Sequence, residues 1–204
     1  MTRTYRIRFL NQPPRRQGVE AFMRITKTAL TLVAFSILAG CSGSSQSIQI
    51  DPRIHMVAEF CDDRWNGQEI PVEGRCGDCG GEGLSPELRI SGLTAEVDEV
   101  TIAFNDLRIP DLAKNGGHGT LGIATAGRAE IILPSVREET MSLPRGVRSV
   151  HKHRCVFYGH KAGAYKAPCG CGYGNEYVAV VKAISRNGEK SIVLAQKEIR
   201  LGFF

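Results

Sequence analysis

The sequence predicts an all-β domain, an antiparallel β-sandwich with few short helices, and three observations support this prediction. Short apolar runs recur along residues 48–204, separated by segments rich in glycine, proline and asparagine. No long amphipathic helical pattern interrupts these runs. Asn187-Gly188 joins the two clearest runs, 177–185 and 191–201, and Asn-Gly between two such runs is a strong hairpin signal. Many short strands at short spacing are typical of a sandwich.

The remaining elements follow in order along the chain. The ranges expected to form strands are 48–50, 54–60, 85–90, 100–104, 121–124, 129–133, 155–158, 177–185 and 191–201. Residues 61–83 and 159–173 are expected to be loops, because glycines and cysteines crowd them. Residues 134–140 allow one helical turn, and residues 143–147 are expected to be a loop. The chain is therefore expected to end in a hairpin strand.

The N-terminal part has the features of a leader and not of the domain. Residues 23–27 form a short basic start, and residues 28–38 form an apolar segment of signal-peptide length. Leu38-Ala39-Gly40-Cys41 matches the bacterial lipobox, so we expect cleavage before Cys41 and lipidation of its thiol. The alternative is an ordinary signal peptide with an incidental cysteine. Met23 is a better start than Met1, because a signal peptide does not need residues 1–22.

The chain thus divides into three parts. Residues 1–40 are an N-terminal extension and lipoprotein signal peptide, residues 41–47 a flexible tether, and residues 48–204 the sandwich domain. Ser42, in place of Asp, follows the cysteine, and by resemblance to known lipoprotein sorting this favours the outer membrane. We therefore expect a lipid-anchored protein of the bacterial cell envelope that faces the periplasm.

The charge of the domain argues against a nucleic-acid-binding surface. The whole chain has a formal net charge of +5, but residues 1–40 hold seven basic residues and one acidic residue. Residues 41–204 therefore carry 19 basic and 20 acidic residues. Binding to nucleic acid needs clustered positive charge that neutralises phosphates, and this domain has no such excess.

Candidate binding residues gather after one predicted strand. The run 100–104 is followed by Asp106, and a glycine-rich loop then leads through Gly117 to His118. Glycine lets a chain approach a ligand closely, and a strand-end carboxylate with a loop histidine suits a small polar pocket. The alternative is that Asp106 caps a turn and that His118 is an ordinary loop histidine.

Four segments in order resemble the phosphatidylethanolamine-binding protein (PEBP) family, in its bacterial Raf-kinase-inhibitor-like branch. They are 79–88 (CGGEGLSPEL), 106–110 (DLRIP), 116–118 (GGH) and 153–154 (HR). The resemblance covers roughly residues 75–185. It implies an antiparallel β-sandwich with a few peripheral helices, in agreement with the strand pattern.

The resemblance also implies an anion pocket. Its lining residues would be Asp106, His118 and His153, to which we add Gly117 and Tyr165. Imidazoles donate to phosphate or carboxylate oxygens, and a carboxylate can hold a histidine in one tautomer or meet an ammonium group. A phospholipid headgroup such as phosphoethanolamine carries both charges.

The sequence departs from the family pattern near this pocket. Arg108 replaces the family's second aspartate and Leu107 its intervening proline. Gly119 and Cys155 stand where the family has aromatic residues. The resemblance therefore implies a wider, more cationic pocket, whose ligand need not be a phospholipid headgroup.

Six cysteines remain if Cys41 is lipidated, and they allow about 15 pairings. They are Cys61, Cys76, Cys79, Cys155, Cys169 and Cys171. Because an exported protein meets an oxidising compartment, disulfides are the expected state. We expect Cys61 to pair with Cys76 or Cys79, which would tie the first loop locally.

We expect Cys155 to pair with Cys169 or Cys171, which would hold the second loop. The alternative is a zinc site, built from Cys76-x-x-Cys79 and Cys169-x-Cys171. A thioredoxin-like redox motif at residues 76–79 is the weakest interpretation, because the βαβ context is missing.

The expected function is a non-catalytic binding module, with no cofactor, for a small anion or a phospholipid headgroup. One alternative is a structural, partner-docking or inhibitory envelope lipoprotein. The other is a metal-dependent hydrolase, in which Asp106, His118 and His153 hold a divalent metal or exchange protons. The chain contains no G-x-S-x-G nucleophile motif, which weighs against a serine hydrolase.

Overall fold

A computed structural model describes residues 46–204, with the backbone alone described at Phe157 and Tyr158. The predicted signal peptide, the lipobox with Cys41 and the tether up to residue 45 lie outside the described residues. Within the described range, no helix is long and apolar enough to cross a bilayer.

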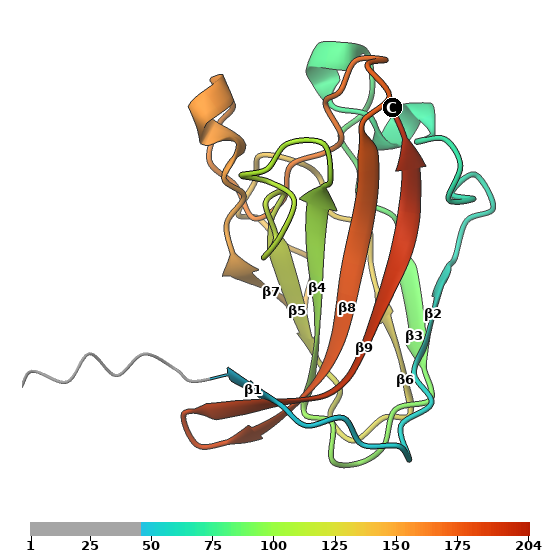
Figure 1. The fold of residues 1–204 in the computed structure, drawn as a ribbon, viewed down its shortest axis with the longest axis vertical. Coiled ribbons are helices and arrows are strands. Elements are labelled where there is room, and N and C mark those ends of the chain that lie inside the picture. Colours follow the sequence, from blue (N-terminus) through green and yellow to red (C-terminus); the bar gives the residue numbers. More distant parts are fainter. Residues whose placement is uncertain (1–45) are drawn as a thin grey trace, which may run out of the picture. The chain divides into compact units, whose positions relative to one another are not determined.

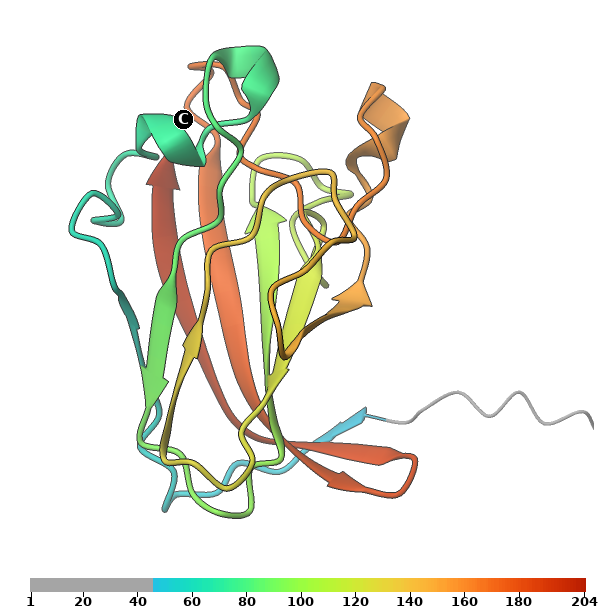
Figure 2. The same ribbon diagram turned by 180° about the vertical axis from the view of Figure 1, so that it is seen from behind.

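In the described part of the chain, nine strands form two sheets that face each other (Figures 1 and 2). The six-stranded sheet has the order β1-β9-β8-β4-β5-β7, and the three-stranded sheet has the order β2-β3-β6. All pairs among these strands are antiparallel except β1 with β9. The strands are β1 (Gln46–Ile48), β2 (Val57–Phe60), β3 (Leu88–Ser91), β4 (Glu99–Asp106), β5 (Thr120–Ala124), β6 (Glu130–Leu133), β7 (Val147–His151), β8 (Glu176–Asn187) and β9 (Lys190–Phe203).

The core lies between the two sheets because apolar and polar residues alternate along the strands. In β3, Leu88 and Ile90 are buried while Arg89 between them is exposed, and β6 shows the same alternation. The central strand β4 differs, since its side chains are almost all buried. The apolar cluster draws its residues from Ile54 to Phe204, so the domain forms its own core.

The all-β prediction is confirmed, and so are most strand positions. Within residues 46–204 the only helical segments are three short 3-10 turns, η1 (Val72–Gly74), η2 (Gly77–Cys79) and η3 (Cys155–Tyr158). The hairpin of β8 and β9 is also confirmed, with Asn187 paired to Lys190. Its two-residue loop is Gly188-Glu189, one residue later than Asn-Gly, and Gly188 supplies the positive φ of 60°.

Four local predictions were wrong. Residues 155–158 form the turn η3 and not a strand, and residues 134–140 contain no helical turn. The strand β7 was missed because its residues are half-exposed and show no apolar run. Gln46 and Ser47 were assigned to the tether but pair with β9 in β1, so the ordered chain begins earlier than residue 48.

The topology brings several distant segments to one end of the sandwich (Figure 1). The end of β4, the start of β5 and the start of β8 lie at this end, with the loops that follow β4 and precede β8. The tip of the β8–β9 hairpin and β1 lie toward the opposite end. All predicted pocket residues belong to the first end.

Candidate functional site

The end of β4 organises the glycine-rich loop through two neighbouring side chains. The Asn105 side-chain oxygen accepts hydrogen bonds from the N–H groups of Gly116 (3.0 Å) and Gly117 (3.3 Å). Asp106 is almost fully buried and accepts from the Arg108 N–H at 2.9 Å and from the Asn175 amide at 2.7 Å. Both carboxylate oxygens of Asp106 are therefore engaged in holding the fold.

Gly117 is needed because the loop packs against itself. A Cβ at this position would lie 2.2 Å from the Leu112 carbonyl oxygen, closer than real Cβ atoms come. The Gly117 carbonyl in turn accepts a hydrogen bond from the Arg154 N–H at 2.8 Å. The Arg154 guanidinium donates to backbone carbonyls of the same loop, including those of Asp111 and Lys114. Gly117 and Arg154 thus shape the site as scaffold.

His118 is buried, and its tautomer is set by a backbone carbonyl. Its Nδ1 lies 2.9 Å from the Lys166 carbonyl oxygen, which can only accept, so Nδ1 carries the proton and Nε2 a free lone pair. Burial lowers the pKa of His118 from 6.5 to about 4, against the opposing effects of this hydrogen bond and of Asp106. His118 is therefore neutral at pH 7. A backbone carbonyl, and not the Asp106 carboxylate, therefore fixes the tautomer of His118.

His153 repeats this arrangement with the ring reversed. Its Nε2 lies 2.9 Å from the Lys161 carbonyl oxygen, which leaves Nδ1 as the free acceptor. Burial lowers the pKa of His153 as well. Tyr165 packs its ring edge against Phe104 at 4.9 Å between centroids, and burial raises the pKa of its hydroxyl. Tyr165 therefore keeps its proton and can donate it in a hydrogen bond.

Three buried polar atoms of the site have no hydrogen-bond partner among the described side chains and backbone. They are Nε2 of His118, Nδ1 of His153 and the Tyr165 hydroxyl. Buried polar groups are nearly always paired, and leaving one unpaired costs about 1–3 kcal/mol. The predicted residues thus divide into two kinds: Asp106 and Gly117 build the site, and the other three offer atoms to a ligand or to water.

A buried ion cluster lies beside the histidines, and no sequence motif pointed to it. The Lys166 ammonium lies 2.8 Å from a carboxylate oxygen of Glu138 and 2.8 Å from one of Glu139. Burial by itself lowers the pKa of Lys166, but the hydrogen bonds that its ammonium donates to both carboxylates raise the pKa overall. Lys166, the residue that follows Tyr165, therefore keeps its positive charge. Glu138 and Glu139 are distant from Lys166 in the sequence, and the fold brings them into contact with it.

Tyr177 was not foreseen as a neighbour of the site, whereas Cys155 was expected near the pocket from its place after His153 and Arg154. The Tyr177 ring stands edge-on to His118, with 5.5 Å between the centroids. The Cys155 thiol is free and buried, 3.7 Å from the Gly117 carbonyl oxygen. Burial raises its pKa to about 12, so the thiol is unreactive at neutral pH.

The predicted cysteine pairing was wrong. The disulfides are Cys76–Cys169 and Cys79–Cys171, and they join the two long loops to each other. Cys61 is a free, exposed thiol that follows β2 directly, at the start of the first loop. Spacing along the chain favoured local pairing, but the strand order brings residues 76–79 next to residues 169–171.

The donor atoms of Asp106, His118 and His153 do not form a metal site in the described part of the chain. Groups of three ligands within ligating distance of one another occur there, but none contains two of these residues. Both oxygens of Asp106 are also already engaged by N–H donors. This arrangement offers no support for the metal-dependent alternative.

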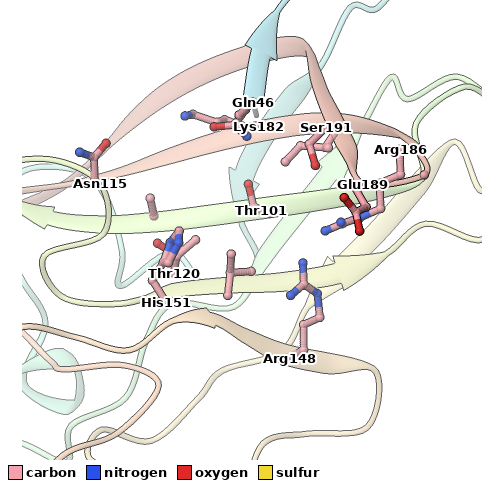
Figure 3. A pocket seen from close by; sticks show the side chains of 14 residues that line it. Gln46, Thr101, Asn115, Thr120, Arg148, His151, Lys182, Arg186, Glu189 and Ser191 are labelled. Carbon is pink, nitrogen blue, oxygen red and sulfur yellow. The ribbon is translucent and has the colours of Figure 1, made fainter. Parts of the chain in front are cut away.

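A polar groove of about 800 Å³ lies on the outer face of the six-stranded sheet (Figure 3). Figure 3 shows Thr120 and His151 at one part of it, and Arg148 and Arg186 at another. None of the five predicted binding residues lines this groove. The groove and the buried site have different lining residues, since Thr120 lines the groove whereas His118 is buried beside Tyr177.

The comparison with known proteins concerns the fold. No protein-family model matches this chain, and no curated protein does. Among solved structures, the chain is similar to E. coli YbcL, whose crystal structure is described as that of a new member of the mammalian PEBP family. The two chains are 18% identical, the match covers 73% of this chain and 97% of YbcL, and the TM-score is 0.48.

Proposed function

We propose that the domain is a non-catalytic binding module of the PEBP type for a small anion or a zwitterionic phospholipid headgroup. The observation that carries the proposal is the trio of unpaired buried atoms on His118, His153 and Tyr165. The resemblance of four sequence segments to the PEBP family supports the proposal, because it implies that Asp106, His118 and His153 line a pocket. The trio belongs to the same end of the domain.

The protonation states indicate how such a ligand would be held. The Tyr165 hydroxyl can donate to an anionic oxygen, whereas both free imidazole nitrogens are acceptors while the rings are neutral. An anion therefore binds best when His118 or His153 takes up a proton and becomes a donor. An ammonium group, as in phosphoethanolamine, can instead donate to the ring that stays neutral.

Calorimetric titration of residues 42–204 with phosphate, phosphoethanolamine, ethanolamine and acetate tests this proposal. We expect phosphoethanolamine to bind most tightly, because it satisfies both a donor and an acceptor of the site. We expect phosphate affinity to rise by up to about tenfold per pH unit between pH 7 and pH 5, since one proton enters with the anion. Titrations in two buffers of different ionisation enthalpy measure that proton directly.

The His153→Gln variant removes one of the free acceptors, and the matched control is His151→Gln in the outer groove. We expect binding to fall at least tenfold in the first variant and to stay unchanged in the second. Absence of saturable heat with all four ligands, or equal binding by both variants, would overturn the proposal. In that case the partner-docking alternative would take its place.

We propose that the domain is held in the bacterial cell envelope by a lipid on Cys41, with the domain in the periplasm. The lipobox at residues 38–41 supports this proposal, and Ser42 favours the outer membrane. Cells grown with a labelled fatty acid should label the wild-type chain and the Cys61→Ser variant, but not Cys41→Ser. Labelling of Cys41→Ser, or an unlabelled wild type, would contradict the anchor.

A further inference from the structure

Four cysteine sulfurs gather at the end of the domain that carries the long loops. Cys76 precedes the 3-10 turn η2 and Cys79 is its last residue, and Cys169 and Cys171 come from the loop that leads to β8. They form the two disulfides Cys76–Cys169 and Cys79–Cys171. The two disulfides are close neighbours, because the sulfurs of Cys76 and Cys79 are 3.4 Å apart and those of Cys79 and Cys169 are 3.9 Å apart.

These distances between the disulfides match the edges of a metal-thiolate tetrahedron. A zinc ion bound by four thiolates at about 2.3 Å sets neighbouring sulfurs about 3.8 Å apart. The distances of 3.4 and 3.9 Å lie on either side of this value. Cys76, Cys79 and Cys169 place their sulfurs within 4.8 Å of one another, and Cys171 is joined to this group through its disulfide with Cys79.

The backbone supports the same geometry from both loops. Cys76 and Cys79 have the C-x-x-C spacing of structural zinc ligands, and the N–H of Cys79 closes the turn by donating to the Cys76 carbonyl at 3.0 Å. Gly80 then turns the chain away with φ of 80°. Cys171 has a left-handed φ of 45°, which non-glycine residues rarely adopt, and its sulfur is bonded to that of Cys79.

We propose that these four cysteines, when reduced, form a tetrahedral four-thiolate site for one Zn²⁺ ion. Binding is balanced by the release of four protons, one from each thiol, so the site carries two negative charges. The exposed Cys171 gives an ion access from solvent, while the buried Cys76 forms the inner wall. The proposal does not depend on the histidine site.

The disulfide form and the zinc form exclude each other, because the same sulfurs serve both. Passing from the disulfides to the thiols takes two equivalents of a dithiol reductant, each of which gives two electrons and two protons and becomes a disulfide itself. A chain that folds in a reducing environment reaches the zinc form first. A chain that folds in an oxidising compartment reaches the disulfide form shown in the structure.

The test compares two preparations of residues 42–204, one made in a reducing cytosol with zinc and one made under oxidising conditions. We expect about one zinc ion per chain and six titratable thiols after denaturation in the first preparation. We expect less than about 0.1 zinc ion and two thiols, those of Cys61 and Cys155, in the second. X-ray absorption at the zinc edge should show four sulfur neighbours at about 2.3 Å in the reduced protein.

The Cys79→Ser variant should lose the zinc, and the matched control Cys61→Ser should keep it. Because Cys79→Ser could unfold, the X-ray absorption of the wild-type protein decides the ligands independently. A folded, reduced wild type without zinc would overturn the proposal. Zinc bound through fewer than four sulfurs, for example with the nearby His160 as a ligand, would also overturn it.

Discussion

Burial decides which protonation state each polar side chain of the candidate site brings to a ligand. His118 is enclosed by Tyr177 and the segment around Lys166, and its ring stays neutral until the pH falls to about 4. Its free Nε2 is an acceptor, and the Tyr165 hydroxyl is a donor. The site as it stands therefore favours a ligand with both kinds of group over a simple anion.

The buried His118 should make the stability of the domain depend on pH. The unfolded chain binds a proton at this residue below about pH 6.5, but the folded chain does so only below about pH 4. Stability from this residue is therefore complete above pH 6.5 and is lost as the pH falls toward 4. The loss amounts to about 3 kcal/mol.

Urea unfolding of wild type and His118→Gln between pH 7 and pH 4 measures this contribution. We expect the difference in free energy of unfolding between the two proteins to shrink by about 3 kcal/mol across that range. The exposed His151→Gln variant serves as control and should follow the wild type. Parallel curves for wild type and His118→Gln would show that the pKa of His118 is not lowered by folding.

At the scale of elements, the two disulfides join the two long loops, which also contribute Trp65, Ile70 and Tyr165 to the apolar core. Each joins residues more than 90 positions apart in the sequence, with separations of 93 and 92. Such a loop closure stabilises the folded state by about 4 kcal/mol. Once one disulfide is closed, the other closes a ring of only about seven residues and adds about 2 kcal/mol.

The two disulfides should consequently not contribute additively. We expect removal of either pair, by Cys76→Ala/Cys169→Ala or by Cys79→Ala/Cys171→Ala, to lower the free energy of unfolding by about 2 kcal/mol. We expect removal of both pairs to cost about 6 kcal/mol, more than the sum of the two. Urea unfolding without reductant measures each value, with Cys61→Ala as control. A loss for all four cysteines equal to the sum of the two pairs would contradict this account.

At the scale of the whole molecule, a buried carboxylate links strands across the outer face of the six-stranded sheet. Glu99 of β4 is hydrogen-bonded to Arg148 of β7 at 2.8 Å and to Arg186 of β8 at 3.1 Å. Gly122 of β5 lies between them, and a Cβ there would meet a Glu99 oxygen at 2.4 Å. The glycine therefore leaves room for a link that spans four neighbouring strands.

Replacing Glu99 should weaken the sandwich more than replacing an exposed partner does. Burial raises the pKa of Glu99, but the hydrogen bonds from Arg148 and Arg186 outweigh it and lower the pKa overall. Because both arginines are nearly half exposed, we expect Glu99→Gln to cost about 1–2 kcal/mol at pH 7. The exposed pair of Arg89 and Glu130 supplies the control Glu130→Gln, with a loss below about 0.5 kcal/mol.

Thermal or urea unfolding at pH 7 measures both variants. The stability that this link gives to the wild type should also decline as the pH falls through the lowered pKa of Glu99, and Glu99→Gln should lack that part of the decline. Equal losses for Glu99→Gln and Glu130→Gln would show that the link does not stabilise the sheet.

Residue patterns alone were enough to predict the fold class and the main strands, because a strand with one buried face has an apolar side chain at every second residue. The alternation along β3 and β6 and the Asn-Gly signal between β8 and β9 are local properties. Gly117 was expected to let the chain approach a ligand, whereas in the structure it lets the loop approach Leu112. The strand β7 is half-exposed, shows no such alternation of apolar and polar residues, and was missed.

Which residues meet depended on the three-dimensional fold. The pairing of Cys76 with Cys169 and the enclosure of Lys166 by Glu138 and Glu139 depend on distances across the sandwich. Residue spacing along the chain does not encode those distances. The protonation state of His118 also depends on the three-dimensional fold, because its pKa follows from burial and from the carbonyl that its ring faces. The sequence could point to the histidines, but the packing around them determined which nitrogen of each is free.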